Sequence, residues 1–341
     1  MLAYWVMIFH LISIPLIGQY AVFSFYVLSG FLMTTIMHET YGYHFDGLKS
    51  YATNRFLRLY PIYWAVLIFS IIIVLLVSEP YSIKFKDSIR IPINLEEALY
   101  NVTMIYPALS PGEIQPRLSP STWALTVEIF FYICIGLGIS KTRERSITWL
   151  SVSVLYFIIS YAASLSDSHR YFTILAASLP FSLGAIAYHF KKDLIDLAQT
   201  LKISSPLSIL ILYISHALIF CIHKYYMPFS YSNLINEVGI YSNLILSLFS
   251  VIALYYNGEE LFNKRFDRLI GDFSYPIYLC HWQCGLLASY LLYDIPTKGQ
   301  SIEGVKVAAL STIFVLIISV VLIKLIDNNI AAIRTRIKKN L

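Results

Sequence analysis

The sequence predicts an all-α protein, a polytopic integral membrane bundle with about ten transmembrane helices. Of its 341 residues, 57% are hydrophobic and only 13% are charged, whereas a soluble domain carries about 25% charged residues. Apolar runs of about 20 residues, the length that crosses the hydrocarbon core of a bilayer, recur along the whole chain. The runs do not alternate as the strands of a membrane barrel do, so they predict helices.

These apolar runs divide the chain into ten expected spans and two long connections, residues 41–58 and 79–121. The second connection is too short for a separate domain. We therefore expect a single transmembrane domain that occupies residues 1–341. The expected spans are residues 1–18, 20–38, 59–78, 122–140, 147–165, 171–189, 206–222, 236–256, 273–293 and 306–326.

The positions of Lys and Arg predict the orientation of the bundle. If the N-terminus is cytoplasmic, sixteen of the 25 Lys and Arg residues fall in cytoplasmic connections and eight in outside connections. Half of those eight lie in the long 79–121 connection, and long connections weigh less in the positive-inside rule. We therefore expect both termini in the cytoplasm. The mild net charge of +5 follows from this pattern, and we expect no nucleic-acid partner.

The four cysteines do not predict a metal centre. Cys134, Cys221, Cys280 and Cys284 all fall inside apolar runs. Cys280 and Cys284 share a helix face but lack the His and carboxylate spacing of a metal site. We expect buried small side chains there and no bound metal.

The first apolar run carries a histidine, His10, between Phe9 and Leu11. A titratable group at membrane depth is expensive and usually faces a cavity or a partner. A neutral imidazole can act as a base near neutral pH. His10 is therefore either a general base or a structural histidine bonded to a neighbouring helix.

The second and third runs carry small residues and a pair of arginines. Ser29 and Gly30 are small enough to let two helices approach closely, and we expect them to serve packing. Arg55 and Arg58 are three residues apart, so on a helix both project from one face, at the cytoplasmic mouth of the third run. Two guanidinium forks on one face suit a phosphate-rich ligand. Snorkelling positive-inside residues would give the same pattern.

The fourth run contains a single acid, Glu128, about two turns from its outside end. An unpaired carboxylate there would be costly, so we expect Glu128 to pair with a cation or to stay protonated. Trp123 stands at the outside end of the same run. It is either an aromatic platform for a glycan or a member of the interfacial aromatic belt.

A second intramembrane histidine, His281, follows Pro276 in the ninth run. Proline near the start of a helix is tolerated or kinks it. A structural role and a substrate-binding role both fit His281 at this depth.

Taken together, these strings resemble the acyltransferase-3 family of membrane acyltransferases. The family order is an early-helix His, a phenylalanine-rich segment ending Ser-Gly-Phe-Leu, and Arg-x-x-Arg followed by Pro-x-Tyr-Trp. The order ends with two further motifs, Trp-x-Leu-x-x-Glu-x-x-Phe-Tyr and a late Tyr-x-hydrophobic-Tyr-Leu-x-His. The matching strings stand in this order at residues 10, 29–32, 55–64, 123–132 and 275–281.

One feature of the family pattern has no counterpart here. In the family an Arg precedes the His by about three helical turns. That position falls before Met1 in this sequence. We therefore expect either a start upstream of Met1 or a divergent member of the family.

The resemblance implies ten core helices, acyl-coenzyme A as a cytoplasmic co-substrate, no tightly bound cofactor, and a carbohydrate or lipid-linked sugar as acceptor. It implies catalytic roles for His10 and Glu128 and donor binding by Arg55 and Arg58. We assign Trp123 and His281 to substrate binding. The expected protein is an O-acyltransferase of a bacterial inner membrane that acetylates a hydroxyl of a surface polysaccharide. A succinyl or longer acyl group stays open.

Two other classes of membrane protein share several of these features. A transporter or flippase for glycan or lipid would also carry ionisable residues in many helices. The sequence has no visible internal repeat, which disfavours that class. A glycan polymerase would need an outside loop that grips a polyanion, and this loop is only modestly basic. Release of free coenzyme A from acetyl-coenzyme A in the presence of acceptor separates acyl transfer from both.

Overall fold

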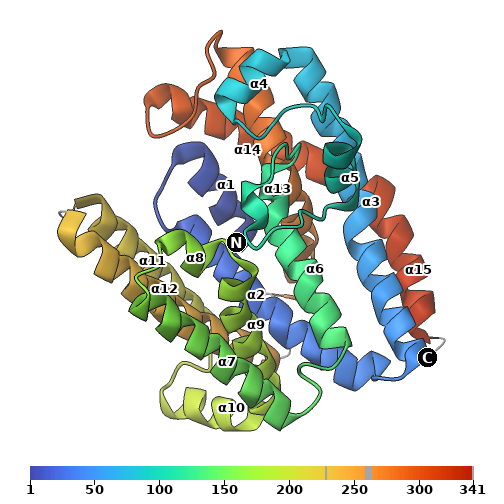
Figure 1. The fold of residues 1–341 in the computed structure, drawn as a ribbon, viewed down its shortest axis with the longest axis vertical. Coiled ribbons are helices and arrows are strands. Elements are labelled where there is room, and N and C mark those ends of the chain that lie inside the picture. The colour runs from blue at the N-terminus through green and yellow to red at the C-terminus, as the bar shows by residue number, and fades with distance from the viewer. Residues whose placement is uncertain (227–228, 258–262, 340–341) are drawn as a thin grey trace.

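The computed structural model describes residues 1–226, 229–257 and 263–339, with only the backbone at residues 229–233, 264 and 338–339. Within these ranges the chain is all-helical, with 81% helix and no strand. Figure 1 shows an upright bundle of helices. The predicted fold class, a polytopic helical membrane protein, is confirmed.

The first three helices differ from the predicted spans at their ends. Helix α1 is Leu2–Ile12, α2 is Ile17–Ile36, continued by the π-turn η1 Met37–Tyr41, and α3 is Phe45–Val77. The prediction of a single helix over residues 1–18 was wrong. Ser13 ends α1 with a left-handed backbone conformation, and Pro15 has no N–H group to continue the helix. Most of the expected 41–58 connection is helix, since α3 begins at Phe45 and runs through Pro61.

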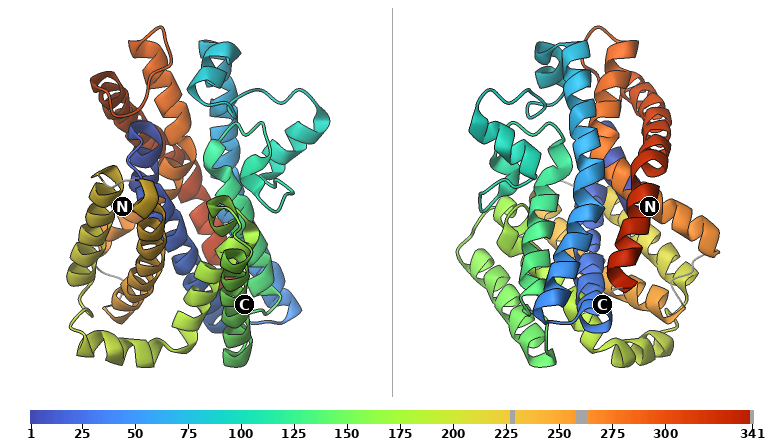
Figure 2. Two further views of the ribbon diagram at one scale, coloured as in Figure 1. Left: turned by 60° about the vertical axis from the view of Figure 1, so that its left-hand side comes forward. Right: turned by 90° about the vertical axis from the view of Figure 1, so that its right-hand side faces the viewer.

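The long 79–121 connection is ordered and partly helical. It contains α4 Glu79–Phe85, α5 Leu95–Thr103 and two single 3₁₀ turns, η2 Pro111–Glu113 and η3 Pro120–Thr122. Figures 1 and 2 place α4 and α5 at one end of the bundle, called the upper end here, together with the connection between α13 and α14.

A helix occupies the place of each of the other predicted spans. These helices are α6 Trp123–Gly136, α7 Arg143–Ala162, α8 Asp167–Tyr171, α9 Ile174–His189, α11 Pro206–Tyr226, α12 Phe229–Tyr256, α13 Lys264–Leu292 and α14 Ile302–Leu322. A short helix, α10 Lys191–Thr200, lies at the opposite, lower end, where α3 also begins (Figure 1). The chain closes with η4 Ile323–Asp327 and α15 Asn328–Lys339.

Among the described residues, seven helical spans are long and apolar enough to cross a membrane. Two other apolar helices are shorter than a bilayer requires: α1 has 11 residues, and the η3–α6 segment covers Pro120–Gly136. Helix α13 has 29 residues but is not one of the seven spans. The predicted ten segments are thus present as helices, and seven of them meet the criteria for a full span.

Helices α2 and α9 approach each other at two glycines. A Cβ atom on Gly30 would lie 2.2 Å from the carbonyl oxygen of Phe181, and one on Gly184 would lie 2.1 Å from that of Val27. Such backbone-to-backbone contact is possible only for residues without a side chain. The expected packing role of Gly30 is therefore what the structure shows.

We predict that Gly30→Val lowers the free energy of unfolding by about 1–3 kcal/mol, because the added side chain forces α2 and α9 apart. The measurement is the midpoint of thermal unfolding of the detergent-solubilised protein. Gly271→Ala is the control, since a Cβ there meets nothing within 4 Å. An unchanged midpoint for Gly30→Val would contradict the close helix contact.

Candidate active site

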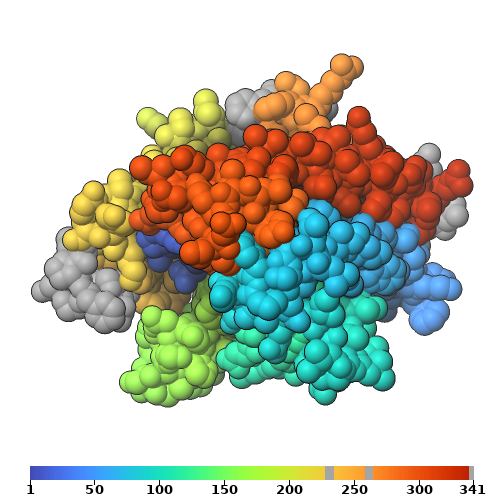
Figure 3. Space-filling model, turned by 90° about the horizontal axis from the view of Figure 1, so that it is seen from above, coloured from blue at the N-terminus to red at the C-terminus, as the bar shows by residue number. Residues whose placement is uncertain are grey.

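Two cavities of about 380 Å³ each lie one above the other inside the bundle. The lower cavity is formed by α2, α3, α6 and α13, and its walls include Ser29, Arg55, Arg58, Glu128 and Tyr132. The upper cavity lies beneath the connections of the upper end, and its walls include His10, Gln19, Lys86, Arg117, Trp123, Trp282 and Lys298. Seen from above, α1 is visible in a hollow between the upper connections (Figure 3).

Arg55 and Arg58 project from α3 into the lower cavity, as their spacing predicts. Arg58 donates to Asp327 of η4 at 3.1 Å, and the Asp327 carboxylate is nearly buried. Arg55 forms no ion pair among the described residues. Its Nη1 lies 3.7 Å from the Met33 sulfur, and its buried Nε has no hydrogen-bond partner there. Because α3 begins at Phe45, Arg55 lies about 15 Å along the helix rather than at its start.

Glu128 faces the same lower cavity from α6. Ser29 donates its hydroxyl proton to Glu128 Oε1 at 2.5 Å, and the Tyr132 hydroxyl donates to the same oxygen. Ser29 is thus more than the packing residue that we expected. Arg55 and Arg58 line the same cavity, but in the described part of the chain neither forms an ion pair with Glu128, so the expectation that it pairs with a cation or stays protonated remains a prediction.

His10 faces the upper cavity and is bonded to the second predicted histidine. The His10 Nδ1 and His281 Nε2 atoms are 2.8 Å apart, and His281 Nδ1 is 3.1 Å from the Ile277 carbonyl oxygen. A carbonyl only accepts, so we assign the His281 proton to Nδ1. His281 Nε2 then accepts the proton of His10 Nδ1, and His10 Nε2 keeps a free lone pair. This is the tautomer of a general base.

His281 itself is fully buried behind His10. Both of its ring nitrogens are occupied by protein partners. This position suits a residue that orients His10 better than one that touches substrate. Trp123, by contrast, lines the upper cavity and contacts Tyr171 and Phe172, so it forms part of an aromatic wall.

The two cavities share two wall residues, Val22 of α2 and Tyr278 of α13. Tyr278 is fixed by two hydrogen bonds with Ser121: its hydroxyl donates to the Ser121 carbonyl at 2.9 Å, and the Ser121 hydroxyl donates to the Tyr278 carbonyl at 2.9 Å. His10 and Glu128, predicted as one catalytic set, therefore lie in different cavities on opposite sides of this wall.

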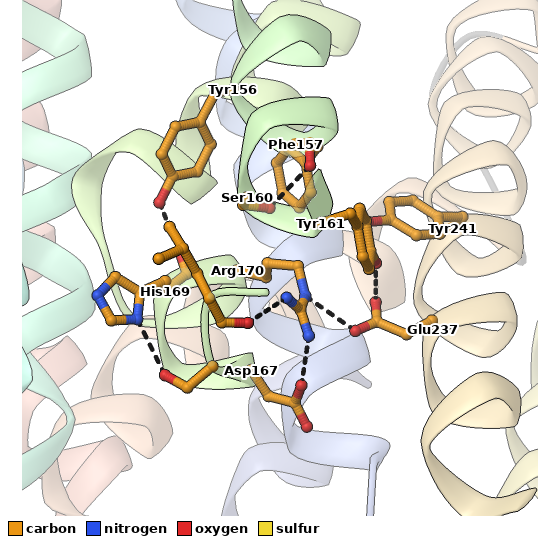
Figure 4. Close-up of polar contacts among 11 residues, drawn as sticks. Tyr156, Phe157, Ser160, Tyr161, Asp167, His169, Arg170, Glu237 and Tyr241 are labelled. Atoms are coloured by element: carbon orange, nitrogen blue, oxygen red, sulfur yellow. Dashed lines mark hydrogen bonds and ion pairs between the residues drawn. The ribbon is translucent and has the colours of Figure 1, made fainter. Parts of the chain in front are cut away.

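The α8 segment closes one side of the upper cavity through Tyr171 and Phe172. Arg170 holds this segment in place: its Nε donates to Glu237 of α12 at 3.0 Å and its Nη2 to Asp167 at 2.5 Å (Figure 4). The Tyr161 hydroxyl donates to the same Glu237 at 2.5 Å. This network ties α7, α8 and α12 together outside the cavity.

Three cations of the upper cavity were missed as site residues by the sequence reasoning. Lys86 and Arg117 stand far apart in the 79–121 connection, Lys298 stands in the connection before α14, and no spacing in the sequence would bring the three together. Burial and the neighbouring Lys86 ammonium lower the pKa of Lys298 to about 8. Burial also lowers the pKa of Arg117. In the described part of the chain, no group of three or more His, Cys, Asp or Glu residues could hold a metal ion.

Comparison with known proteins gives one match. Residues 1–324 match the family model described as an acyltransferase domain. Neither the curated proteins nor the solved structures contain a significant match to the chain. The family model covers both cavities and every residue assigned to them above.

Proposed function

Because the chain belongs to the acyltransferase-3 family, and is thus a multi-pass membrane acyltransferase, we propose that it transfers an acyl group from acyl-coenzyme A to a hydroxyl of a bacterial surface polysaccharide or of its lipid-linked precursor. Acetyl is the preferred group. The observation that carries the proposal is the pair of adjoining cavities, one with two guanidiniums and the other with a histidine whose Nε2 is free.

The donor enters the lower cavity. Arg55 has no ion pair among the described residues and is free to bind a phosphate, and Arg58 offers a second positive charge shared with Asp327. Guanidiniums bind phosphate oxygens bidentately, which suits the phosphates of coenzyme A. The lower end is then cytoplasmic, in the inner membrane, because the connections rich in Lys and Arg lie there. The thin pantetheine arm points upward, toward Val22 and Tyr278.

The acceptor enters the upper cavity, with its hydroxyl at His10. His10 Nε2 takes the hydroxyl proton while the hydroxyl oxygen attacks the thioester carbonyl carbon. The new C–O ester bond forms, the C–S bond breaks, and the coenzyme A thiolate leaves with the electron pair. The proton then passes from His10 to the thiolate or to solvent. His281 keeps His10 in the required tautomer throughout.

Glu128 acts on the donor side in this scheme. Its carboxylate, held by Ser29 and Tyr132, stands in the cavity with Arg55 and Arg58. We assign it to positioning these guanidiniums around the donor rather than to proton transfer at His10.

We predict that His10→Ala lowers the transfer rate by about 10²–10⁴-fold, the usual contribution of general-base catalysis. Free coenzyme A released from acetyl-coenzyme A is measured with membranes that contain the surface glycan. His281→Ala should also slow transfer, whereas His281→Gln should restore much of it and shift the pH profile, because an amide oxygen can accept the His10 proton. A normal rate for His10→Ala would exclude this histidine from the chemistry.

We predict that Arg55→Ala raises the KM for acetyl-coenzyme A by at least about tenfold, since a charge-assisted contact to phosphate is lost. Acetyl-pantetheine, which lacks the nucleotide, should be used equally well by the variant and the wild type. The control is Lys49→Ala, an exposed cation on the same helix. Equal loss with both donors would contradict the phosphate role.

We predict that Val22→Trp slows transfer of the acyl group at least about tenfold, measured as release of free coenzyme A, because the indole obstructs the wall that the two cavities share. The control Val152→Trp places the same side chain on the exposed face of α7. A wild-type rate for Val22→Trp would show that the acyl group does not pass this wall.

A further inference from the structure

The upper cavity is lined by three cations and, among the described residues, by no acid. Lys86 comes from the connection after α4, Arg117 from the segment before η3, and Lys298 from the connection before α14. Cavities lined by one sign of charge concentrate ligands of the opposite sign. The arrangement is therefore unusual for a site that accepts only neutral sugars.

The partners of these cations leave most of their charge uncompensated. Arg117 is buried and donates to the backbone carbonyls of Pro120, at 3.2 Å, and Ile114. Lys298 Nζ donates to the Phe85 carbonyl at 2.7 Å. In the described ranges, the one carboxylate paired with the cluster is Asp87, 3.0 Å from Lys86 Nζ and 60% exposed. Three positive charges thus face one carboxylate that lies largely in solvent.

The two ammonium groups stand close to the proposed base. Lys298 Nζ is 4.8 Å and Lys86 Nζ is 5.8 Å from the centre of the Trp282 ring. The His10 ring centre is 4.7 Å from the same indole. Trp282 Nε1 is a buried donor without a hydrogen-bond partner among the described residues. Ammonium, indole and guanidinium groups can only donate, so they need a ligand rich in acceptor oxygens.

We propose, building on the acyl transfer proposed above, that the acceptor carries a carboxylate or phosphate near the hydroxyl that is acylated, and that Lys86 and Lys298 hold this anionic group. Trp123 and Phe172 supply the aromatic face for the sugar ring. The anion fixes the ring at Trp282 and brings a hydroxyl of the same sugar to His10. An acidic sugar or a sugar phosphate meets these demands, whereas a neutral sugar supplies no negative charge to balance the cations of the cavity.

The protonation of Lys298 makes this binding dependent on pH. The groups that face Lys298 are Lys86 and Asp87 from the α4–α5 connection and His10 from α1. With a pKa of about 8, Lys298 is charged below pH 8 and loses its charge as the pH rises through that value. The affinity for an anionic acceptor should therefore fall between pH 7 and pH 9.

The test is binding to the full-length protein in nanodiscs, measured by calorimetry without donor. The probes are methyl β-D-glucuronide, glucose 1-phosphate and methyl β-D-glucoside. We expect at least one anionic probe to bind about tenfold or more tightly than the glucoside, and the glucuronide and the phosphate distinguish the two kinds of anion. Lys298→Met should reduce the difference to about threefold or less, whereas Lys298→Arg should keep it and remove the loss above pH 8.

Lys84→Met, an exposed cation on α4, is the matched control and should behave as the wild type. Equal affinity for the three probes, no binding of any of them, or a preference that survives Lys298→Met would overturn the anionic acceptor. The proposed function fails separately: an anionic probe that binds but releases no coenzyme A from acetyl-coenzyme A would count against acyl transfer and leave the anion site standing.

Discussion

The hydrogen bond between His10 and His281 joins α1, a helix of 11 residues, to α13, which has 29 residues. Within a bilayer a polar side chain without a partner is strongly disfavoured, so an imidazole at this depth requires a fixed acceptor. The Ile277 carbonyl sets the proton on His281, and His281 sets the proton on His10. Helix α1, with 11 residues, gains in this way a defined position against α13.

The roof of the upper cavity depends on a second set of polar contacts. The Ser119 hydroxyl donates to the Leu279 carbonyl at 2.9 Å, and Gln283 Nε2 donates to the Leu118 carbonyl at 2.9 Å and to the Ser70 hydroxyl at 2.7 Å. These bonds dock the end of the 79–121 connection onto α13. The same connection delivers Lys86 and Arg117 to the cavity, so its folding and the assembly of the site are one event.

Much of the fold could be predicted because hydrophobicity is a local property. The apolar runs predicted the helices. The spacing of Arg55 and Arg58 predicted that both lie on one helix face, and both line the lower cavity. The helix ends were harder to predict, since the left-handed Ser13 and the early start of α3 depend on neighbouring packing. The placement of His10 and Glu128 in different cavities could not be predicted. The order of motifs along the chain does not show into which cavity each side chain projects.

The three cations of the upper cavity could not be predicted from the sequence either. Lys86, Arg117 and Lys298 stand in connections where a positive charge is unremarkable by itself. Only the folding of two distant connections, residues 79–121 and the one between α13 and α14, over one histidine brings them together. His10 and His281 stand 271 residues apart in the sequence, and only the tertiary structure brings their rings into contact.

The shared wall of Val22 and Tyr278 has an energetic consequence for the proposed transfer between the two cavities. In the proposed reaction coenzyme A, with its phosphate charges, stays on the side where it bound. The acyl group passes the wall toward the acceptor, and when the proton held by His10 passes back to the thiolate no net charge is displaced. Moving one elementary charge through 100 mV would take about 2.3 kcal/mol. With the proton returned to the thiolate, the proposed transfer would avoid this electrical work and would be driven by cleavage of the thioester.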